Sequence, residues 1–236
     1  MNGLTKYKED TFSLENFLSE EESKKVIAYL EFLVKNKILE WNQISFYESY
    51  AMGFWEEDPN LLLFGLPKDY FNKLKLRIKN LAEELLGIEL SEVSYHAQKW
   101  TEGGFASFHS DNTDEHGNFT AFERSKFAVF IYLNEDFTGG YLNFKNYDIH
   151  ITPKTGMLAM FSGTFGNEHE VTMVKEGTRY TVGSFWDDAN SVYTEDQKQA
   201  WAEELKSTRA EQEEMYKQWA EEKKRGIFPS YKGKQE

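Results

Sequence analysis

The chain has 236 residues, with 27 Lys and Arg against 40 Asp and Glu, a formal net charge of −13, and no cysteine. The lack of cysteine excludes disulfide scaffolds, cysteine-ligated zinc sites and thiol nucleophiles, and the negative charge argues against nucleic acid and anionic membranes as partners. No apolar run reaches the roughly 18 residues of a membrane span, and the N-terminus lacks the apolar core of a signal peptide, so we expect a cytoplasmic protein.

The first ninety residues are expected to be mainly helical. The expected elements are a lead-in strand or loop over residues 1–18, a helix over about 20–36, a strand near 44–50 and a second helix over 68–86. Ser19 fits the N-cap of the first helix, with Glu22 three residues later to complete a capping box. Gly87 is the expected stop of the second helix.

The middle of the chain alternates short apolar runs with glycine-containing turns. Strands are expected over 93–100, 127–133, 141–144, 147–151, 157–161 and 180–186. The polar segment 112–124 predicts a long mobile loop, which could also act as a substrate lid through Phe119 and Phe122. Asp187 and Asp188 are expected to be solvated turn acids. Many short strands with glycine turns indicate a double-sheet jelly roll or a related barrel.

The last part of the chain returns to helical spacing. It predicts an amphipathic helix or helix pair that braces the barrel or contacts another copy of the chain. We find no internal repeat and no low-complexity linker, so we expect one domain of the α+β class with a mainly β core. Its parts are a helical N-terminal support (1–90), a jelly-roll core (91–190) and a C-terminal helical extension (191–236).

Candidate metal ligands stand in the stretch WTEGGFASFHSD, where a strand runs into two glycines. In an extended segment His109 and Asp111 lie on the same face. Together with His169 they would form a two-histidine, one-carboxylate triad of the kind that binds ferrous iron, provided that the strand of His169 lies opposite that of Asp111. A bare HxD is found in many surface segments. Other residues of the chain are therefore needed to distinguish a metal site from hydrogen-bonding surface residues.

Arg179 follows His169 by ten residues, in an apolar strand that should face inward at alternate positions. A buried guanidinium without a partner is costly, so an anion is expected beside it. A carboxylate of a ligand would bind it through two hydrogen bonds. A salt bridge to one of the chain's own acids is the alternative.

Three further histidines have less definite roles. His96 lies four residues before Trp100 and, like Gln98, shares its strand face. If Trp100 faces a pocket, His96 and Gln98 line it; if not, they are satisfied core or edge residues. We expect His116, in the loop, and His150, in a strand, at the surface.

These motifs, in this order, resemble the iron(II)- and 2-oxoglutarate-dependent dioxygenases of the prolyl 4-hydroxylase type. The likeness covers about residues 93–187 and rests on W-x-x-G-G-x-x-x-x-H-x-D, FIYLNEDFTGGYLNF, ITPKTGMLAMF and HEVTMVKEGTRYTVGSFW. The N-terminal FLSEEES helix also fits. The resemblance implies Fe(II), 2-oxoglutarate and O₂ as cofactors, with ascorbate as an optional addition.

The resemblance implies a role for each matching residue. His109, Asp111 and His169 would ligate iron. Arg179 would pair with the distal carboxylate of 2-oxoglutarate, and Tyr132 would donate a hydrogen bond to the same cosubstrate. The retained Asp111 indicates hydroxylation, because related halogenases carry a small residue there to admit chloride.

The rest of the cosubstrate pocket matches the family in part. Leu142 and Val171 correspond to apolar pocket positions. Trp100 and Ala106 depart from the pattern, since the family usually carries Tyr at these two positions. Trp100 can still pack on the cosubstrate, but it offers an indole N–H in place of a phenol.

The resemblance therefore predicts a hydroxylase of prolyl residues in a protein or peptide. Two alternatives stay open: an oxygenase with the same cofactors that acts on a free amino acid or other small molecule, and a non-catalytic jelly-roll binding module. The acidic charge would steer a basic or Lys-flanked peptide toward the protein and repel nucleic acid.

Overall fold

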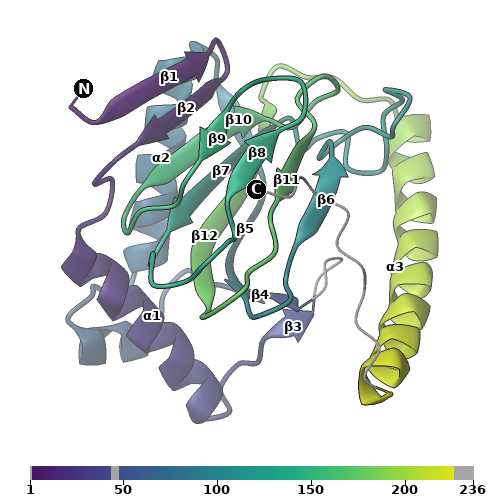
Figure 1. The fold of residues 1–236 in the computed structure, drawn as a ribbon. Helices are drawn as coiled ribbons and strands as arrows, with labels where there is room; N and C mark the ends of the chain where they lie inside the picture. The colour runs from purple at the N-terminus through teal and green to yellow at the C-terminus, as the bar shows by residue number, and fades with distance from the viewer. Residues whose placement is uncertain (1, 44–47, 226–236) are drawn as a thin grey trace.

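The structure is a computed structural model that describes residues 2–43 and 48–225, with the side chains of the last helix described in part. Two β-sheets face each other, and helices flank them (Figure 1). None of the described helices combines the length and the apolar character needed to cross a membrane.

The elements alternate between helices and short strands before a long run of strands. In chain order they are β1 (Leu4–Lys8), β2 (Thr11–Leu14), α1 (Glu20–Lys35), β3 (Asn42–Gln43), β4 (Ser49–Gly53), the 3-10 helix η1 (Pro59–Phe64), α2 (Tyr70–Leu86), β5 (Leu90–Trp100), β6 (Ala106–His109), β7 (Phe127–Tyr132), β8 (Leu142–Phe144), β9 (His150–Ile151), β10 (Leu158–Ser162), β11 (His169–Val171), β12 (Arg179–Asp188) and α3 (Glu195–Lys224). The large sheet has the order β1-β2-β10-β7-β12-β5-β4-β3 and the small sheet β6-β11-β8-β9, with antiparallel pairing. The predicted jelly-roll core with flanking helices is confirmed.

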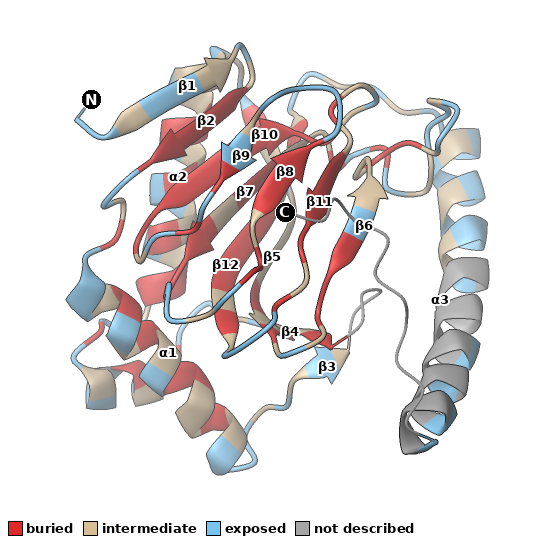
Figure 2. Cartoon of the chain, viewed as in Figure 1, coloured by how far each residue is buried: buried red, intermediate tan, exposed pale blue. Residues whose placement is uncertain are grey.

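The central strands of the large sheet have buried side chains on both faces, because alternate residues of a strand point to opposite sides. On β7, Val129 and Ile131 join the core shared with α1 and α2, whereas Ala128 and Tyr132 belong to the cluster between the two sheets. Figure 2 shows the buried residues concentrated in these central strands. The helix side chains in the first core include Val26, Leu30, Leu33, Leu74 and Ile78. The other alternate residues of these strands therefore point into the space between the two sheets.

The ends of the two N-terminal helices follow the sequence signals. The Ser19 side chain accepts a hydrogen bond from the backbone N–H of Glu22 at 3.1 Å, which caps α1. The carboxylate of Glu22 accepts instead from the Tyr70 hydroxyl at 2.9 Å and from Arg77 at 3.2 Å. The predicted capping box is therefore half formed, because Glu22 ties α1 to α2. Gly87 ends α2 in the left-handed conformation.

The N-terminal part supplies more strand than its sequence predicts. The β1–β2 hairpin and the β3–β4 pair form the two edges of the large sheet, so residues 1–90 are not a purely helical support. The strand expected near 44–50 begins at Ser49, and residues 44–47 lie outside the described part. The strand expected over 147–151 is reduced to β9, because the chain turns after β8. The division into three parts stays a prediction.

The polar segment 112–124 is a loop, as predicted, and its tip is held by side-chain hydrogen bonds. The carboxylate of Asp114 accepts from the backbone N–H groups of His116 and Asn118, each at 2.8 Å. This is the local turn chemistry that Asp favours. His116 is exposed there, as expected.

Asp187 is buried, with 2% of its surface exposed, and the prediction of a solvated turn acid is wrong for it. Arg124 Nε lies 3.4 Å from its Oδ2, and Lys126 Nζ lies 3.1 Å from its Oδ1. The hydroxyl of Tyr193 donates to the same carboxylate at 2.9 Å, and the Tyr193 ring packs on Trp201 with centroids 4.9 Å apart. Asp187 therefore joins the end of the loop to the start of α3, which stands on the β6 side of the molecule (Figure 1).

Replacing Asp187 with Ala is expected to lower the free energy of unfolding by about 1–3 kcal/mol, because the substitution leaves the partly buried Lys126 without its buried partner. Urea unfolding would measure the change at constant m-value. Asp148→Ala, at an exposed loop acid, is the matched control and should change stability by less than about 0.5 kcal/mol. Equal effects of the two substitutions would contradict a stabilising role for Asp187.

Candidate functional site

The pairing of β6 with β11 places His109 directly opposite His169. The Nε2 atoms of His109 and His169 lie 3.7 Å and 3.6 Å from Oδ1 of Asp111. One ligand atom from each of the three residues lies within 4.8 Å of the others. The strand arrangement that the sequence required for a facial triad is therefore present, and this cluster can hold a metal ion.

Backbone carbonyls orient both imidazoles. His109 Nδ1 lies 2.7 Å from the carbonyl oxygen of Ser107, and His169 Nδ1 lies 3.1 Å from that of Asn167. Because a carbonyl oxygen only accepts, each Nδ1 carries the proton, and each Nε2 presents its lone pair. Proteins orient histidine ligands of metals in this way.

Burial moves the three side chains toward their neutral forms. It raises the pKa of Asp111 to about 8 and lowers the pKa of His109. Burial and the nearby His109 ring together hold the pKa of His169 well below its usual range. Oδ2 of Asp111 is buried without a hydrogen-bond partner in the described part of the chain. A divalent cation offsets this cost, and two imidazoles with one carboxylate suit ferrous iron.

Gly163 lies against the carboxylate of Asp111. Its carbonyl oxygen accepts the backbone N–H of Asp111 at 2.8 Å. A Cβ atom added at residue 163 would lie 2.3 Å from Oδ2 and 2.6 Å from Cβ of Asp111. A side chain at this position therefore has to displace the carboxylate.

Gly163→Ala is expected to weaken metal binding by about tenfold or more, because the carboxylate loses its place beside the two imidazoles. Calorimetric titration with Mn(II) would measure the affinity, and circular dichroism would check that the sheets remain folded. Gly53→Ala on β4 is the control, since a Cβ there meets nothing within 4 Å. An unchanged Mn(II) affinity in Gly163→Ala would show that Asp111 is not a ligand.

Arg179 is buried with its guanidinium between two aromatic rings. Its Cζ lies 5.1 Å from the Trp100 ring centroid and 5.0 Å from that of Tyr132. Within the described residues, Nε and Nη1 of Arg179 and the hydroxyl of Tyr132 are buried without hydrogen-bond partners, and no ion pair joins Arg179 to an acid. Burial lowers the pKa of Arg179. Unpaired buried donors of this kind fit a carboxylate from a ligand better than the alternative of an internal salt bridge.

A cavity of about 570 Å³ joins Arg179 to the metal-ligand cluster. Its walls include all the positions that the resemblance assigned to the cosubstrate pocket: Trp100, Ala106, Tyr132, Leu142 and Val171. His96 and Gln98 also line it, as the strand alternation predicted for the case in which Trp100 faces the pocket. The sequence therefore identified most of the polar residues of this cavity.

Several aromatic rings of the cavity did not emerge from the sequence. Phe130 on β7, Phe185 on β12 and Phe161 on β10 line it. Their positions could have identified them, because alternate residues of a strand face opposite sides and these rings alternate with residues of the helix-side core.

Trp100 and Ala106, the two departures from the family pattern, are neighbours in one buried cluster with Val171 and Val174. A large ring at one position thus accompanies a small side chain at the other. The indole N–H of Trp100 donates to Oε1 of Gln98 at 3.3 Å. The N–H of Trp100 is therefore directed to Gln98, and not to the cosubstrate as expected for the phenol of a tyrosine.

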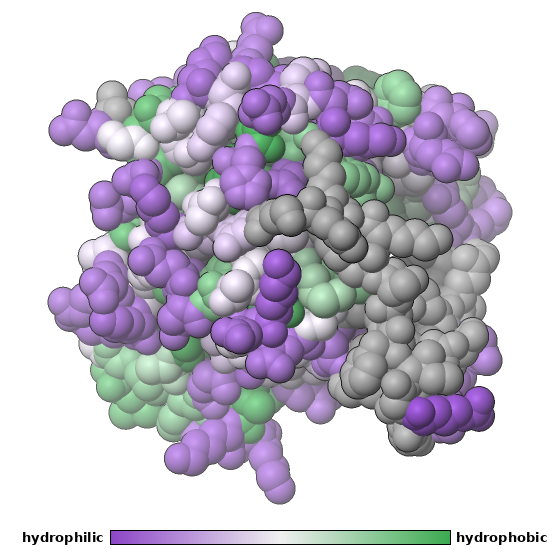
Figure 3. Space-filling model, viewed as in Figure 1, coloured by the Kyte–Doolittle hydropathy of each residue, from purple (hydrophilic) through white to green (hydrophobic). Residues whose placement is uncertain are grey.

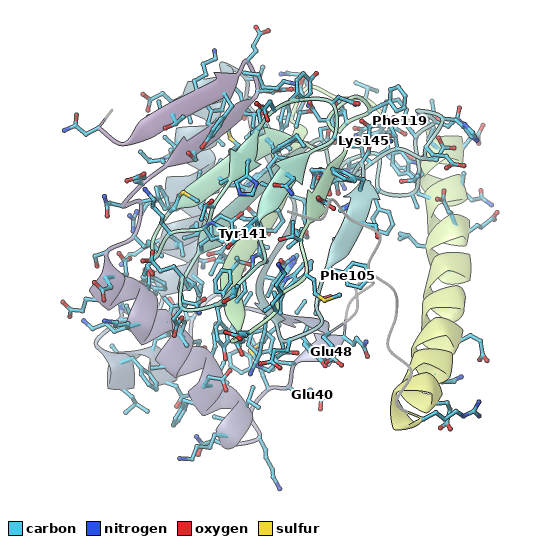
Figure 4. The ribbon with its side chains drawn as sticks, in the orientation of Figure 1. Glu40, Glu48, Phe105, Phe119, Tyr141 and Lys145 are labelled. Carbon is cyan, nitrogen blue, oxygen red and sulfur yellow. The ribbon has the colours of Figure 1, made fainter. Side chains whose placement is uncertain are left out.

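The two loop aromatics expected to contact a substrate differ in position. Phe122 lines the cavity with 43% of its surface exposed. Phe119, 58% exposed, lies beyond the lining, near one end of β6, while Phe105 marks the other end (Figure 4). His150 is an exposed strand residue, as predicted.

Comparison with known proteins finds one family model that matches the strand-rich middle of the chain. Residues 94–187 match the family model described as the 2OG-Fe(II) oxygenase superfamily. No curated protein sequence matches the chain.

Three solved structures are similar in fold. A prolyl hydroxylase from Trichoplax adhaerens in complex with a hypoxia inducible factor peptide fragment has a TM-score of 0.58 and 17% identity, over 81% of this chain and 86% of that one. A Pseudomonas putida prolyl-4-hydroxylase has 0.54 and 18%, over 77% and 94%. The viral collagen prolyl hydroxylase from Paramecium Bursaria Chlorella virus-1, a 2OG complex, has 0.52 and 15%, over 76% and 96%. At these identities the likeness is one of fold.

Proposed function

We propose that this chain, whose residues 94–187 match the family model of the 2OG-Fe(II) oxygenase superfamily, is an Fe(II)- and 2-oxoglutarate-dependent hydroxylase. The observation that carries the proposal is the buried guanidinium of Arg179, whose Nε and Nη1 have no hydrogen-bond partner among the described residues, in the same cavity as the His109, Asp111 and His169 cluster. A binding module without catalysis gives no reason to combine a metal-ligand cluster with a buried anion site.

In this proposal each side chain has one task. The Nε2 atoms of His109 and His169 and a carboxylate oxygen of Asp111 hold the metal. Arg179 and Tyr132 hold the distal carboxylate of 2-oxoglutarate through the donors that have no partner in the described part of the chain. When bound, the iron and its cosubstrates supply the oxidation, in which 2-oxoglutarate and O₂ become succinate and CO₂ and one oxygen atom enters the substrate.

The remaining walls of the cosubstrate end are apolar. Leu142 and Val171 line the cavity there, and the ring of Trp100 lies against the guanidinium. Apolar walls exclude water, which strengthens the pairing between a bound carboxylate and Arg179. The protein contributes position and electrostatics, and the retained Asp111 supports hydroxylation.

We further propose a prolyl residue of a protein or peptide as the substrate. The similar structures include prolyl hydroxylases, one of them in complex with a peptide fragment, which supports this choice. Hydrophilic residues cover most of the described surface in the view of Figure 3, and with a net charge of −13 they favour the approach of a basic peptide. A free amino acid or other small molecule is the alternative.

The test is a turnover assay. The purified protein with Fe(II), 2-oxoglutarate and O₂ should release succinate, slowly even without a substrate. Mass spectrometry of a treated peptide pool should then find peptides that gain one oxygen atom. Absence of succinate, together with no binding of Fe(II) or 2-oxoglutarate, would rule out the enzyme.

A further inference from the structure

Away from Arg179, the cavity is lined by rings and uncharged polar groups. The register of β5 on β12 pairs Trp100 with Arg179, Gln98 with Thr181, His96 with Gly183 and Ser94 with Phe185. At about 3.3 Å per residue, the Ser94–Phe185 end lies about 20 Å along the strands from the Arg179 end. Asp111 and Arg179 are the charged residue types among the described lining residues, and neither lies at the Ser94–Phe185 end. This outer end therefore carries no full charge.

A chain of one-way hydrogen bonds fixes the proton of His96. The Trp100 indole N–H and the Thr181 hydroxyl both donate to Oε1 of Gln98, each at 3.3 Å. Because an indole nitrogen only donates, this end of the Gln98 amide is its oxygen, and its nitrogen Nε2 faces His96 Nε2 at 3.1 Å. The amide nitrogen also only donates, so His96 Nε2 accepts and the ring proton sits on Nδ1.

The surroundings of His96 keep its ring neutral and in place. Phe185 lies nearly parallel to it, with centroids 6.3 Å apart. A Cβ at Gly183, the residue opposite His96, would lie 2.7 Å from the Phe130 ring and 3.7 Å from Cδ of Gln98, so the glycine lets that ring pack against the strand. Burial lowers the pKa of His96 to about 4. Among the described residues, the ring of His96 forms its side-chain hydrogen bond with Gln98 through Nε2. The Nδ1–H donor is therefore left for a ligand.

We propose that His96 determines specificity by donating its Nδ1–H to an uncharged oxygen of the substrate, such as an amide carbonyl, and that this end of the cavity takes an uncharged, apolar group. This inference rests on the proposed function. A free amino acid would bring an ammonium and a carboxylate to walls that offer no countercharge for either group, and burying such unpaired charges is costly. A residue within a peptide carries neither of these two charges. Gln98, Trp100 and Thr181 act through His96 as positioning residues.

The tautomer of His96 is directly measurable. Nitrogen-15 NMR of the full chain with Zn(II) in place of iron should show His96 protonated at Nδ1, with its signals assigned by their loss in His96→Phe. Gln98→Glu places a group that accepts where the amide donated, so the proton should move to Nε2. Protonation at Nε2 in the unaltered chain would overturn the hydrogen-bond chain, and this readout does not depend on turnover.

The substrate class is tested with two probes: a pool of N-acetylated, C-amidated peptides and a mixture of free amino acids. The unaltered protein should hydroxylate capped peptides and not the free amino acids. His96→Phe keeps a ring but lacks the donor, so the ratio of hydroxylated peptide to succinate should fall about tenfold. His96→Asn, which restores a neutral N–H, should recover part of the ratio.

His116→Phe, at an exposed histidine of the loop, is the matched control and should leave the ratio unchanged. Equal hydroxylation of free amino acids, hydroxylation of neither probe despite succinate release, or an unchanged ratio in His96→Phe would overturn the proposal. If the unaltered protein consumes no 2-oxoglutarate, the proposed function fails, while the tautomer measurement still decides the hydrogen-bond chain.

Discussion

Arg179→Met is expected to stabilise the ligand-free protein and, at the same time, to raise the KM for 2-oxoglutarate by about a hundredfold. The two effects have one cause, which is a buried guanidinium whose Nε and Nη1 have no partner in the described chain. Replacing such a cation by an apolar side chain of similar volume removes a desolvation cost of about 1–4 kcal/mol. The same change removes the donors proposed to bind the distal carboxylate.

Urea unfolding with and without 2-oxoglutarate, and succinate release against 2-oxoglutarate concentration, would measure both effects. The cosubstrate should stabilise the unaltered protein and not the variant. Arg77→Met, which removes a half-exposed arginine paired with Glu22, is the control and should produce neither the gain in stability nor the rise in KM. If Arg179→Met keeps its affinity for 2-oxoglutarate, the role assigned to Arg179 is wrong.

His169→Ala is expected to abolish iron-dependent turnover. His169 is 3% exposed, and its Nε2 is one of three ligand atoms in the cluster. Two protein ligands would remain, which is too few for a stable facial site. Calorimetric titration with Mn(II) and the succinate assay should both lose their signal, while circular dichroism should remain that of the folded protein.

Two further variants separate loss of a ligand from loss of the fold. His169→Gly leaves space for added imidazole, which should restore part of the metal binding. His150→Ala removes an exposed histidine from the same small sheet and should change neither readout. Metal binding by His169→Ala equal to that of the unaltered chain would refute the proposed site.

The sequence predicted the fold class and the half-site of His109 and Asp111 because both depend on local order. The alternation in β5 placed His96, Gln98 and Trp100 on one face, and the spacing around His109 and Asp111 predicted the half-site. The cluster with His169 further requires the β6–β11 register, for which the resemblance gave the expectation and the structure the geometry.

The features that the sequence did not predict depend on contacts between residues that are far apart in the chain. Asp187 reads as a turn acid, and its burial follows from Arg124 and Lys126, more than sixty residues earlier. Thr181 reads as one more strand residue until it meets Gln98 across the sheet. Propensity and periodicity describe neighbours in sequence, so cross-strand contacts of this kind stay outside their reach.

The shared buried cluster of Trp100 and Ala106 has a consequence for substitutions at these two positions. A tyrosine introduced at residue 106 alone would crowd the indole, and a tyrosine at residue 100 alone would leave space beside the alanine, so each single exchange is disfavoured in the background of the other. A joint exchange of the two residues is therefore expected to cost less stability than either single exchange. Exchange at residue 100 also removes the indole that orients Gln98, so the same substitution would disturb the donor that His96 offers.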